Sequence, residues 1–212
     1  GHLRHAAYQA GGCRPLERNY TWPATEPVLT AHASMASSGV ILSACALEAG
    51  VNELHLAAVD GTEPSLGYLF PHAEQIVELW DTVERGSLLR KYQWFLTLAG
   101  LPPMPPGQQP LQGASDLIEL RDALVHWKPE WSNDPKYSER IERRLAGKFP
   151  LNALSMPDQL FIPYRGCGYG AACWAVKSAE AFLLAFAALI GVTHPLEKHT
   201  EEIAAFLAID AV

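Results

Sequence analysis

The longest helical pattern of the chain covers residues 30–59. This segment is rich in alanine and leucine and contains no proline, so it predicts one long helix. Asp60-Gly61 and Pro64 follow it, and residues of these types end helices. A second strongly apolar pattern fills residues 171–190 and predicts another long helix.

Five further segments predict shorter helices, at residues 73–83, 87–99, 115–127, 137–146 and 197–209. Ser87 is a suitable N-cap for the second of them, and Gly100 suits the position just after its end. Ser115 or Asp116 is the expected N-cap of the third. That helix should end before Pro129, because the residue preceding a proline avoids helical angles.

The remaining segments predict irregular structure. Residues 1–28 show little periodicity and contain three prolines, which indicates an irregular leader packed on the domain. The proline-rich stretch 101–110 predicts an extended, exposed connection. Strand signals are scarce, and the proline in LFIPY, residues 160–164, argues against a strand there. We therefore predict an all-α fold: a single helical-bundle domain of about six to seven helices over residues 29–212, preceded by the leader.

Composition narrows the classes of function. The chain has 212 residues, 49% of them hydrophobic, and a formal net charge of −7. This acidity argues against broad electrostatic binding to duplex nucleic acid, although a small basic site remains compatible with it. The longest apolar run, residues 181–192, is too short to span a bilayer. We expect a cytoplasmic protein without membrane contact.

The four cysteines show no zinc-ligand spacing. Cys45 lies in the apolar helix 30–59 and is expected to be a free, buried thiol. No histidine stands at metal-ligand spacing from a cysteine, and His194 and His199, five residues apart, are expected at the surface. We therefore expect no metal and no cofactor.

The stretch LRDALVHWKPEW, residues 120–131, places three chemically active side chains on one helix. Arg121 has apolar neighbours three and four positions away, so it needs a carboxylate, a phosphate or a partner surface. Asp122 and His126 are four residues apart and share a face, where the carboxylate could orient the imidazole. His126 lies about 140° around the helix from Arg121. Both side chains can border one groove.

An arginine beside a histidine suits phosphoryl transfer without a metal. Histidine moves a proton near neutral pH, and arginine holds the charge that grows on phosphate oxygens. A structural interpretation stays open beside this one. Arg121 could bridge to a buried acid, and His126 could cap the helix C-terminus, where a cation is favourable.

The motif R-D-A-L-V-H resembles the signature of the HEPN superfamily, an arginine, a polar residue and then a histidine. ALEAGVNEL (46–54), LVHWKPEW (124–131) and CWAVKSAEAFLLAF (173–186) also look like segments of helical HEPN proteins. The resemblance implies a helical bundle that forms a homodimer, with the arginine/histidine helices facing each other across a cleft.

The resemblance also implies an activity, metal-independent cleavage of single-stranded RNA. The ribose 2′-hydroxyl attacks the adjacent phosphate and leaves a cyclic phosphate and a 5′-hydroxyl. Carried onto this chain, His126 is the acid/base, Arg121 clamps the transition state, and Asp122 orients them. Many such proteins are toxins or act in defence, with an antitoxin-like partner. Others are non-catalytic modules, so the alternative is a dimeric module that binds a protein partner or nucleotide.

Two further groups of residues are candidates for substrate binding. Glu48 and Asn52, four residues apart, could line the same cleft and pair with Arg121, or could form a polar stripe between helices. The second group is basic: Lys128 beside the motif, and three arginines of KYSERIERRLAGK, residues 136–148. These could follow a phosphate backbone, or could be the mixed charges of a solvated helix. The three are Arg140, Arg143 and Arg144.

RGCGYG, residues 165–170, comes just before the predicted helix 171–190. Its backbone amides could bind an anion at the start of that helix. Without a preceding strand and a βαβ unit, a dinucleotide site is disfavoured. The alternative is a turn that needs flexible glycines.

Overall fold

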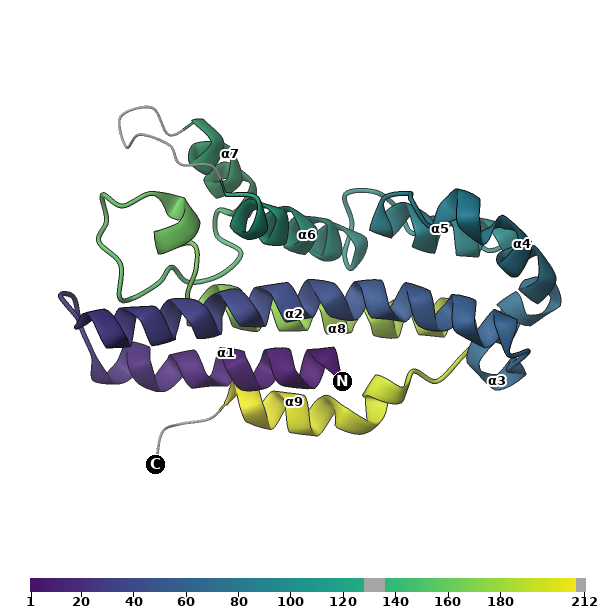
Figure 1. Ribbon diagram of the computed structural model, residues 1–212, viewed down its shortest axis with the longest axis horizontal. Helices are drawn as coiled ribbons and strands as arrows, with labels where there is room; N and C mark the ends of the chain where they lie inside the picture. Colours follow the sequence, from purple (N-terminus) through teal and green to yellow (C-terminus); the bar gives the residue numbers. More distant parts are fainter. Residues whose placement is uncertain (128–135, 209–212) are drawn as a thin grey trace.

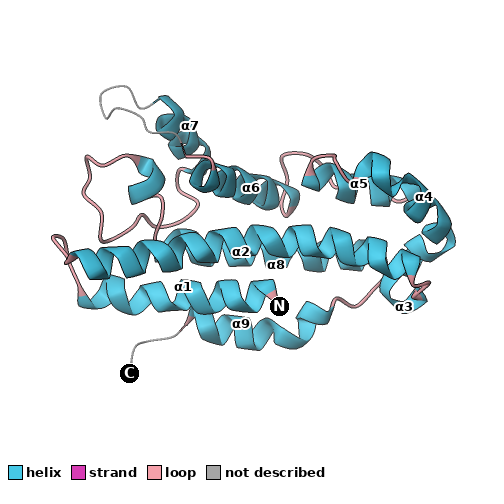
Figure 2. Ribbon diagram, viewed as in Figure 1, coloured by secondary structure: helices cyan, strands magenta, loops and turns pink. Residues whose placement is uncertain are grey.

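The computed structural model describes residues 1–127 and 136–208, and within them the chain is helical, with no strand. Figure 2 shows helices joined by loops. The α-helices are α1 (His2–Asn19), α2 (Glu26–Val59), α3 (Glu63–Leu66), α4 (Ala73–Val83), α5 (Leu88–Leu98), α6 (Leu111–Val125), α7 (Lys136–Leu145), α8 (Tyr169–Leu189) and α9 (Thr200–Leu207). Three shorter helical turns are η1 (Gly67–His72), η2 (Phe161–Arg165) and η3 (Pro195–His199).

The prediction of an all-α fold is confirmed. The long helix predicted over 30–59 is α2, and the one predicted over 171–190 is α8. Ser87 is the N-cap residue of α5, and Gly100 follows its C-cap with φ 68°, the left-handed conformation that favours glycine. The described residues contain nine α-helices, more than the six or seven predicted.

Three long helices, α1, α2 and α8, lie side by side along the long axis of the molecule (Figure 1). Helix α9 packs against α1, on the side away from the second layer. That second layer contains α4, α5 and α6, and α6 contacts both α2 and α8. Helix α7 and η2 lie beyond α6. The C-terminal end of α6 is therefore directed toward the same end of the bundle as the start of α8 (Figure 1).

Helix α1 corrects the prediction of an irregular leader over residues 1–28. Residues 2–19 form a regular helix despite Gly11, Gly12 and Pro15. Its alanines Ala6 and Ala10 are completely buried, and small side chains allow the helices to approach closely. A Cβ added to Gly39 of α2 would lie 3.0 Å from the Cβ of Ala172 on α8 and 3.5 Å from the carbonyl oxygen of Ala6. This helix is stabilised by tertiary packing, which cannot be predicted from the helix propensities of its residues.

The proline-rich connection is anchored at one residue. Most of residues 101–110 are exposed, as predicted, but Met104 is buried. The side-chain amide of Gln93 on α5 donates to the Met104 carbonyl at 2.9 Å and accepts from its N–H at 3.0 Å. The connection is thereby held against α5.

Two helices of the described part, α2 and α8, are long and apolar enough to cross a membrane by length and composition alone. Helix α8 begins before the apolar run 181–192 and also includes residues 169–180, among them Lys177 and Glu180. About a third of the most apolar window of α2, 33%, and 44% of that of α8 are buried inside the protein. The core helices of soluble proteins satisfy the same test.

Candidate functional site

The three motif residues lie at the C-terminal end of α6. Helix α6 begins at Leu111, four and five residues before the expected caps Ser115 and Asp116, and ends at Val125. His126 is the C-cap residue, and its N–H donates to the carbonyl of Asp122 at 2.9 Å. The helix thus ends before the predicted Trp127, while Lys128 and Pro129 lie outside the described residues.

The guanidinium of Arg121 is close to the carboxylate of its neighbour. Arg121 Nε lies 3.2 Å from Asp122 Oδ1, and the two side chains are 30% and 47% exposed. The Nε atom itself is buried and makes no hydrogen bond of good geometry. Arg121 is therefore held by a short-range ion pair at the surface, and within the part of the chain that the structure describes its terminal nitrogens have no acid partner and can bind a second anion.

The imidazole of His126 is exposed and has no side-chain hydrogen bond or ion pair within the described part of the chain. Asp122 contacts His126 only through the hydrogen bond between their backbones, because the Asp122 carboxylate is directed to Arg121 instead. The predicted orienting contact between Asp122 and His126 is thus absent from the single chain. Two apolar side chains flank the histidine: Val125 is 49% exposed and Trp127 is 38% exposed.

Glu48 and Asn52 do not join this site. The carboxylate of Glu48 pairs with Lys91 Nζ of α5 at 3.2 Å, and Asn52 is exposed on α2. The end of α6 packs elsewhere on α2, where Leu124 contacts the cluster that contains Ala36. Twelve residues of helix separate Ala36 from Glu48, about 18 Å at the rise of an α-helix. The hypothesis that either residue pairs with Arg121 is wrong for the single chain.

The basic residues of α7 are mostly occupied by acids of α6. Arg140 pairs with Glu119 at 2.6 Å. Arg144 donates to Asp116 at 2.8 Å and to Glu119 at 3.3 Å. Arg143 is exposed and donates only to the backbone carbonyl of Glu139, at 3.4 Å. Of the three predicted phosphate contacts on α7, only Arg143 has no carboxylate partner among the described residues.

Asp116 is the centre of this charge network rather than an N-cap. Its side chain is completely buried, inside α6. Besides Arg144, the carboxylate accepts from Gln112 Nε2 at 2.8 Å and pairs with Lys148 Nζ at 2.8 Å. Ser115, the other expected cap, accepts from Arg144 at 2.9 Å. These contacts hold α7 on α6.

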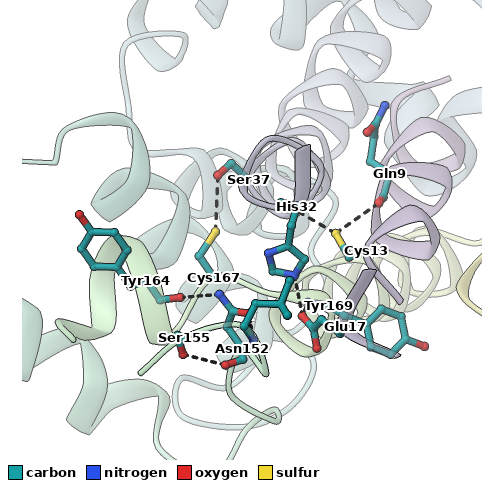
Figure 3. Close-up of polar contacts among 11 residues, drawn as sticks. Gln9, Cys13, Glu17, His32, Ser37, Asn152, Ser155, Tyr164, Cys167 and Tyr169 are labelled. Atoms are coloured by element: carbon teal, nitrogen blue, oxygen red, sulfur yellow. Dashed lines mark hydrogen bonds and ion pairs between the residues drawn. The ribbon is translucent and has the colours of Figure 1, made fainter. Parts of the chain in front are cut away.

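A buried polar cluster that the sequence did not suggest lies between α1, α2 and the start of α8 (Figure 3), and Leu124 at the end of α6 packs beside it. Glu17 Oε1 of α1 is 2.7 Å from Nε2 of His32, which is 2% exposed on α2, and it accepts from the N–H of Tyr169 at 2.7 Å. The N-terminus of α8 therefore does bind an anion, as RGCGYG suggested, but the anion is this chain's own carboxylate. Glu17 ties α1, α2 and α8 together.

Two thiols complete this cluster. Cys13 and Cys167 are buried, and Cys167 Sγ lies 3.5 Å from Ser37 Oγ. Burial raises the pKa of both thiols, so they stay protonated and weakly nucleophilic at neutral pH. Cys45, expected to be buried, is exposed, because it lies on the outer face of α2. No group of three or more metal-ligating side chains gathers in the described ranges.

Comparison of the chain with models of known protein families, with curated proteins and with solved structures returns no match.

The imidazole of His194, expected at the surface, lies half-buried at the start of η3. Its Nδ1 accepts from the N–H of Leu196 at 3.0 Å, which caps η3. Burial lowers the pKa of His194 below its ordinary value of 6.5, although the nearby carboxylates of Glu53 and Glu197 oppose this shift. His199, in contrast, is 41% exposed and pairs with Glu202.

The lowered pKa of His194 predicts a pH dependence of stability. The unfolded chain takes up this proton near pH 6.5, and the folded chain only at lower pH, so acid favours unfolding. We expect the free energy of unfolding to fall as the pH drops through 6.5 toward the folded-state pKa. In His194→Asn, which keeps a capping acceptor but does not titrate, this part of the slope should be smaller. Urea unfolding at several pH values measures both; equal slopes would contradict the assignment.

Proposed function

We propose that this protein is a metal-independent endoribonuclease of the HEPN type that cleaves single-stranded RNA. One observation carries the proposal: at the end of a helix, His126 presents an exposed imidazole that has no partner among the described residues, about one turn beyond the half-exposed Arg121. A general acid/base and a fixed cation are the two groups that this reaction needs. As far as the described residues surround them, both side chains are at least partly exposed and so open to a substrate.

The chemistry follows from the two side chains. A neutral His126 accepts the proton of the ribose 2′-hydroxyl as its oxygen attacks the adjacent phosphorus. The bond between phosphorus and the 5′-oxygen breaks, and this oxygen takes a proton from a protonated histidine. The guanidinium of Arg121 stabilises the negative charge on the phosphate oxygens. Asp122 holds Arg121 in place at 3.2 Å, a role different from the one that its spacing to His126 predicted.

Dimerisation completes the proposed site. Val125 and Trp127 expose apolar surface on either side of His126, and such residues are typical of the centre of an interface. Two copies that meet through this surface bring two arginines and two histidines together. One imidazole then accepts the proton and the other donates it.

A non-catalytic dimeric module is the second candidate, and the α7 contacts favour it. Arg140 and Arg144 are neutralised by Glu119 and Asp116, so the surface beside the motif has few free cations in the described part of the chain. A module would use the same apolar surface to hold a second copy or an antitoxin-like protein.

Cleavage of a mixed-sequence, single-stranded RNA in the presence of EDTA tests the proposal. We expect fragments with cyclic phosphate and 5′-hydroxyl ends, produced by a protein that light scattering shows to be a dimer. Ends of another chemistry would indicate a contaminating nuclease. A dimer that leaves the RNA intact would favour the module, and a monomer at micromolar concentration would contradict both candidates.

A further inference from the structure

A cavity of about 360 Å³ lies at the other end of the bundle from His126, where α2 and α8 end. Its volume falls within the range of small-molecule sites, about 300–1,000 Å³. Residues 62–65 close it on one side and residues 192–195 on the other. In Figure 1 this is the end at which α3 lies, whereas the C-terminal end of α6 is directed the opposite way.

The inner wall of the cavity is apolar. It is formed by the buried side chains of Leu54 on α2, of Leu183 and Phe186 on α8, and of Ile190, the C-cap residue of α8. Tyr92 of α5 also lines the cavity. Its hydroxyl donates a 2.7 Å hydrogen bond to the carbonyl of Leu47, so Tyr92 offers a ligand its apolar ring. The apolar body of a ligand fits this wall.

The mouth of the cavity carries negative charge that no cation among the described residues neutralises. Glu53 of α2 and Asp60, the C-cap residue of α2, line it; they are seven residues apart and so on the same face. Neither carboxylate forms an ion pair within the described residues, and the lining contains no lysine or arginine. His194 adds no positive charge at neutral pH, because its Nδ1 accepts the Leu196 N–H.

The helix ends strengthen this negative potential. The C-terminus of a helix carries a partial negative charge, which a basic residue in the last turn usually offsets. Both α2 and α8 end at the cavity, and neither has a basic residue in its last turn. Two carboxylates and two helix C-termini thus act on one apolar cavity.

We propose that this cavity binds a small organic cation. Its apolar body lies between α2 and α8, and its ammonium group lies at the mouth beside Glu53 and Asp60. A phosphate or carboxylate ligand is excluded by charge, and a neutral apolar ligand would remove water from two carboxylates without replacing its hydrogen bonds. The inference does not depend on RNA cleavage.

Calorimetric titration with three compounds of one shape tests the proposal: phenethylammonium, 2-phenylethanol and 3-phenylpropionate. We expect phenethylammonium to bind in the millimolar range or tighter, 2-phenylethanol at least about tenfold more weakly, and 3-phenylpropionate not measurably. Added salt should weaken binding of the ammonium compound but not of the alcohol. Equal affinities, or no binding of phenethylammonium at millimolar concentration, would overturn the proposal.

Two variants locate the binding. Glu53→Gln keeps the shape and removes one charge, so it should weaken phenethylammonium binding by about fivefold. Glu201→Gln is the matched control, since it removes an exposed carboxylate on α9 and should change nothing. Ala187→Leu adds volume at a buried wall position and should abolish binding. If Glu53→Gln and Glu201→Gln bind alike, the assignment to this cavity is wrong, whether or not the Ala187 variant folds.

Discussion

Replacement of His126 by alanine is expected to lower the rate of RNA cleavage by about two to four orders of magnitude, the usual contribution of a general acid or base. The imidazole is exposed and has no hydrogen bond or ion pair of its own within the described part of the chain. Its removal should therefore leave stability nearly unchanged, which makes the loss of rate a measure of chemistry. Single-turnover cleavage of a labelled RNA, followed beside circular dichroism, provides both readouts.

Two matched variants make this result specific. His5→Ala removes an exposed histidine on α1, and Arg90→Ala removes an exposed arginine on α5. Neither should change the rate. Arg121→Ala should reduce it by about two to three orders of magnitude, because a positioned donor to the developing anion is lost. If His126→Ala retains the rate of His5→Ala, the histidine is a helix-end residue and the endoribonuclease proposal fails.

A variant of Asp122 tests whether its carboxylate assists cleavage by orienting His126 or by positioning Arg121. The sequence spacing predicted that it orients His126, whereas the structure pairs it with Arg121. Asp122→Asn should then resemble a weak form of Arg121→Ala. Combined with Arg121→Ala, it should add little further loss, because both changes act on the same contact.

Helix boundaries that depend on nearby capping and helix-ending residues were predictable from the sequence. Helix α4 begins and ends at the predicted residues, and α5 differs from its predicted range by one residue at each end. Its cap Ser87 and the left-handed Gly100 are fixed by preferences of individual residues, which act at the helix ends themselves. The spacing of Arg121 and His126 likewise placed both residues at one helix end.

Features that depend on distant segments were not predictable. Helix α1 has two glycines and a proline in a polar sequence, and it is stabilised by the close approach of Ala6 and Ala10 to Gly39 of α2. Glu17 and His32 meet because α1 turns back along α2, and the N–H of Tyr169 joins them from 152 residues away. No local pattern reports such a contact.

Asp116 shows how one residue type supports two interpretations. Aspartate favours an N-cap, so it indicated the start of the motif helix. The helix instead begins at Leu111, and Asp116 lies one turn inside it, fully buried. Its partner Arg144 is 28 residues away on α7. Because this acid is so distant in the sequence, Arg144 was predicted to be available for a phosphate contact.

Replacement of Asp116 by alanine is expected to destabilise the protein by about 3 kcal/mol, the low end of the cost of breaking a buried ion pair. The carboxylate of Asp116 is completely buried, and its removal leaves Arg144, Lys148 and Gln112 without this contact. The two cations are 33% and 27% exposed, so they can turn toward water, which keeps the cost from rising further. For a chain of this length, the melting temperature should fall by about 6–12 °C.

Urea unfolding followed by circular dichroism measures this loss, with Asp81→Ala as the control. Asp81 is an exposed aspartate on α4, and its removal should cost less than about 0.5 kcal/mol. Asp116→Asn retains the shape and one acceptor but places an amide beside the ammonium of Lys148, so its loss of stability should lie between those of Asp116→Ala and Asp81→Ala.

If Asp116→Ala were as stable as the control, the network would stabilise the protein no more than a surface ion pair does. The arginines of α7 would then be free to leave their acids for a phosphate, and the positive surface that RNA binding requires would be restored at little cost. A large loss means that α7 holds α6 in place, and that His126 and Arg121 must work with few additional cations.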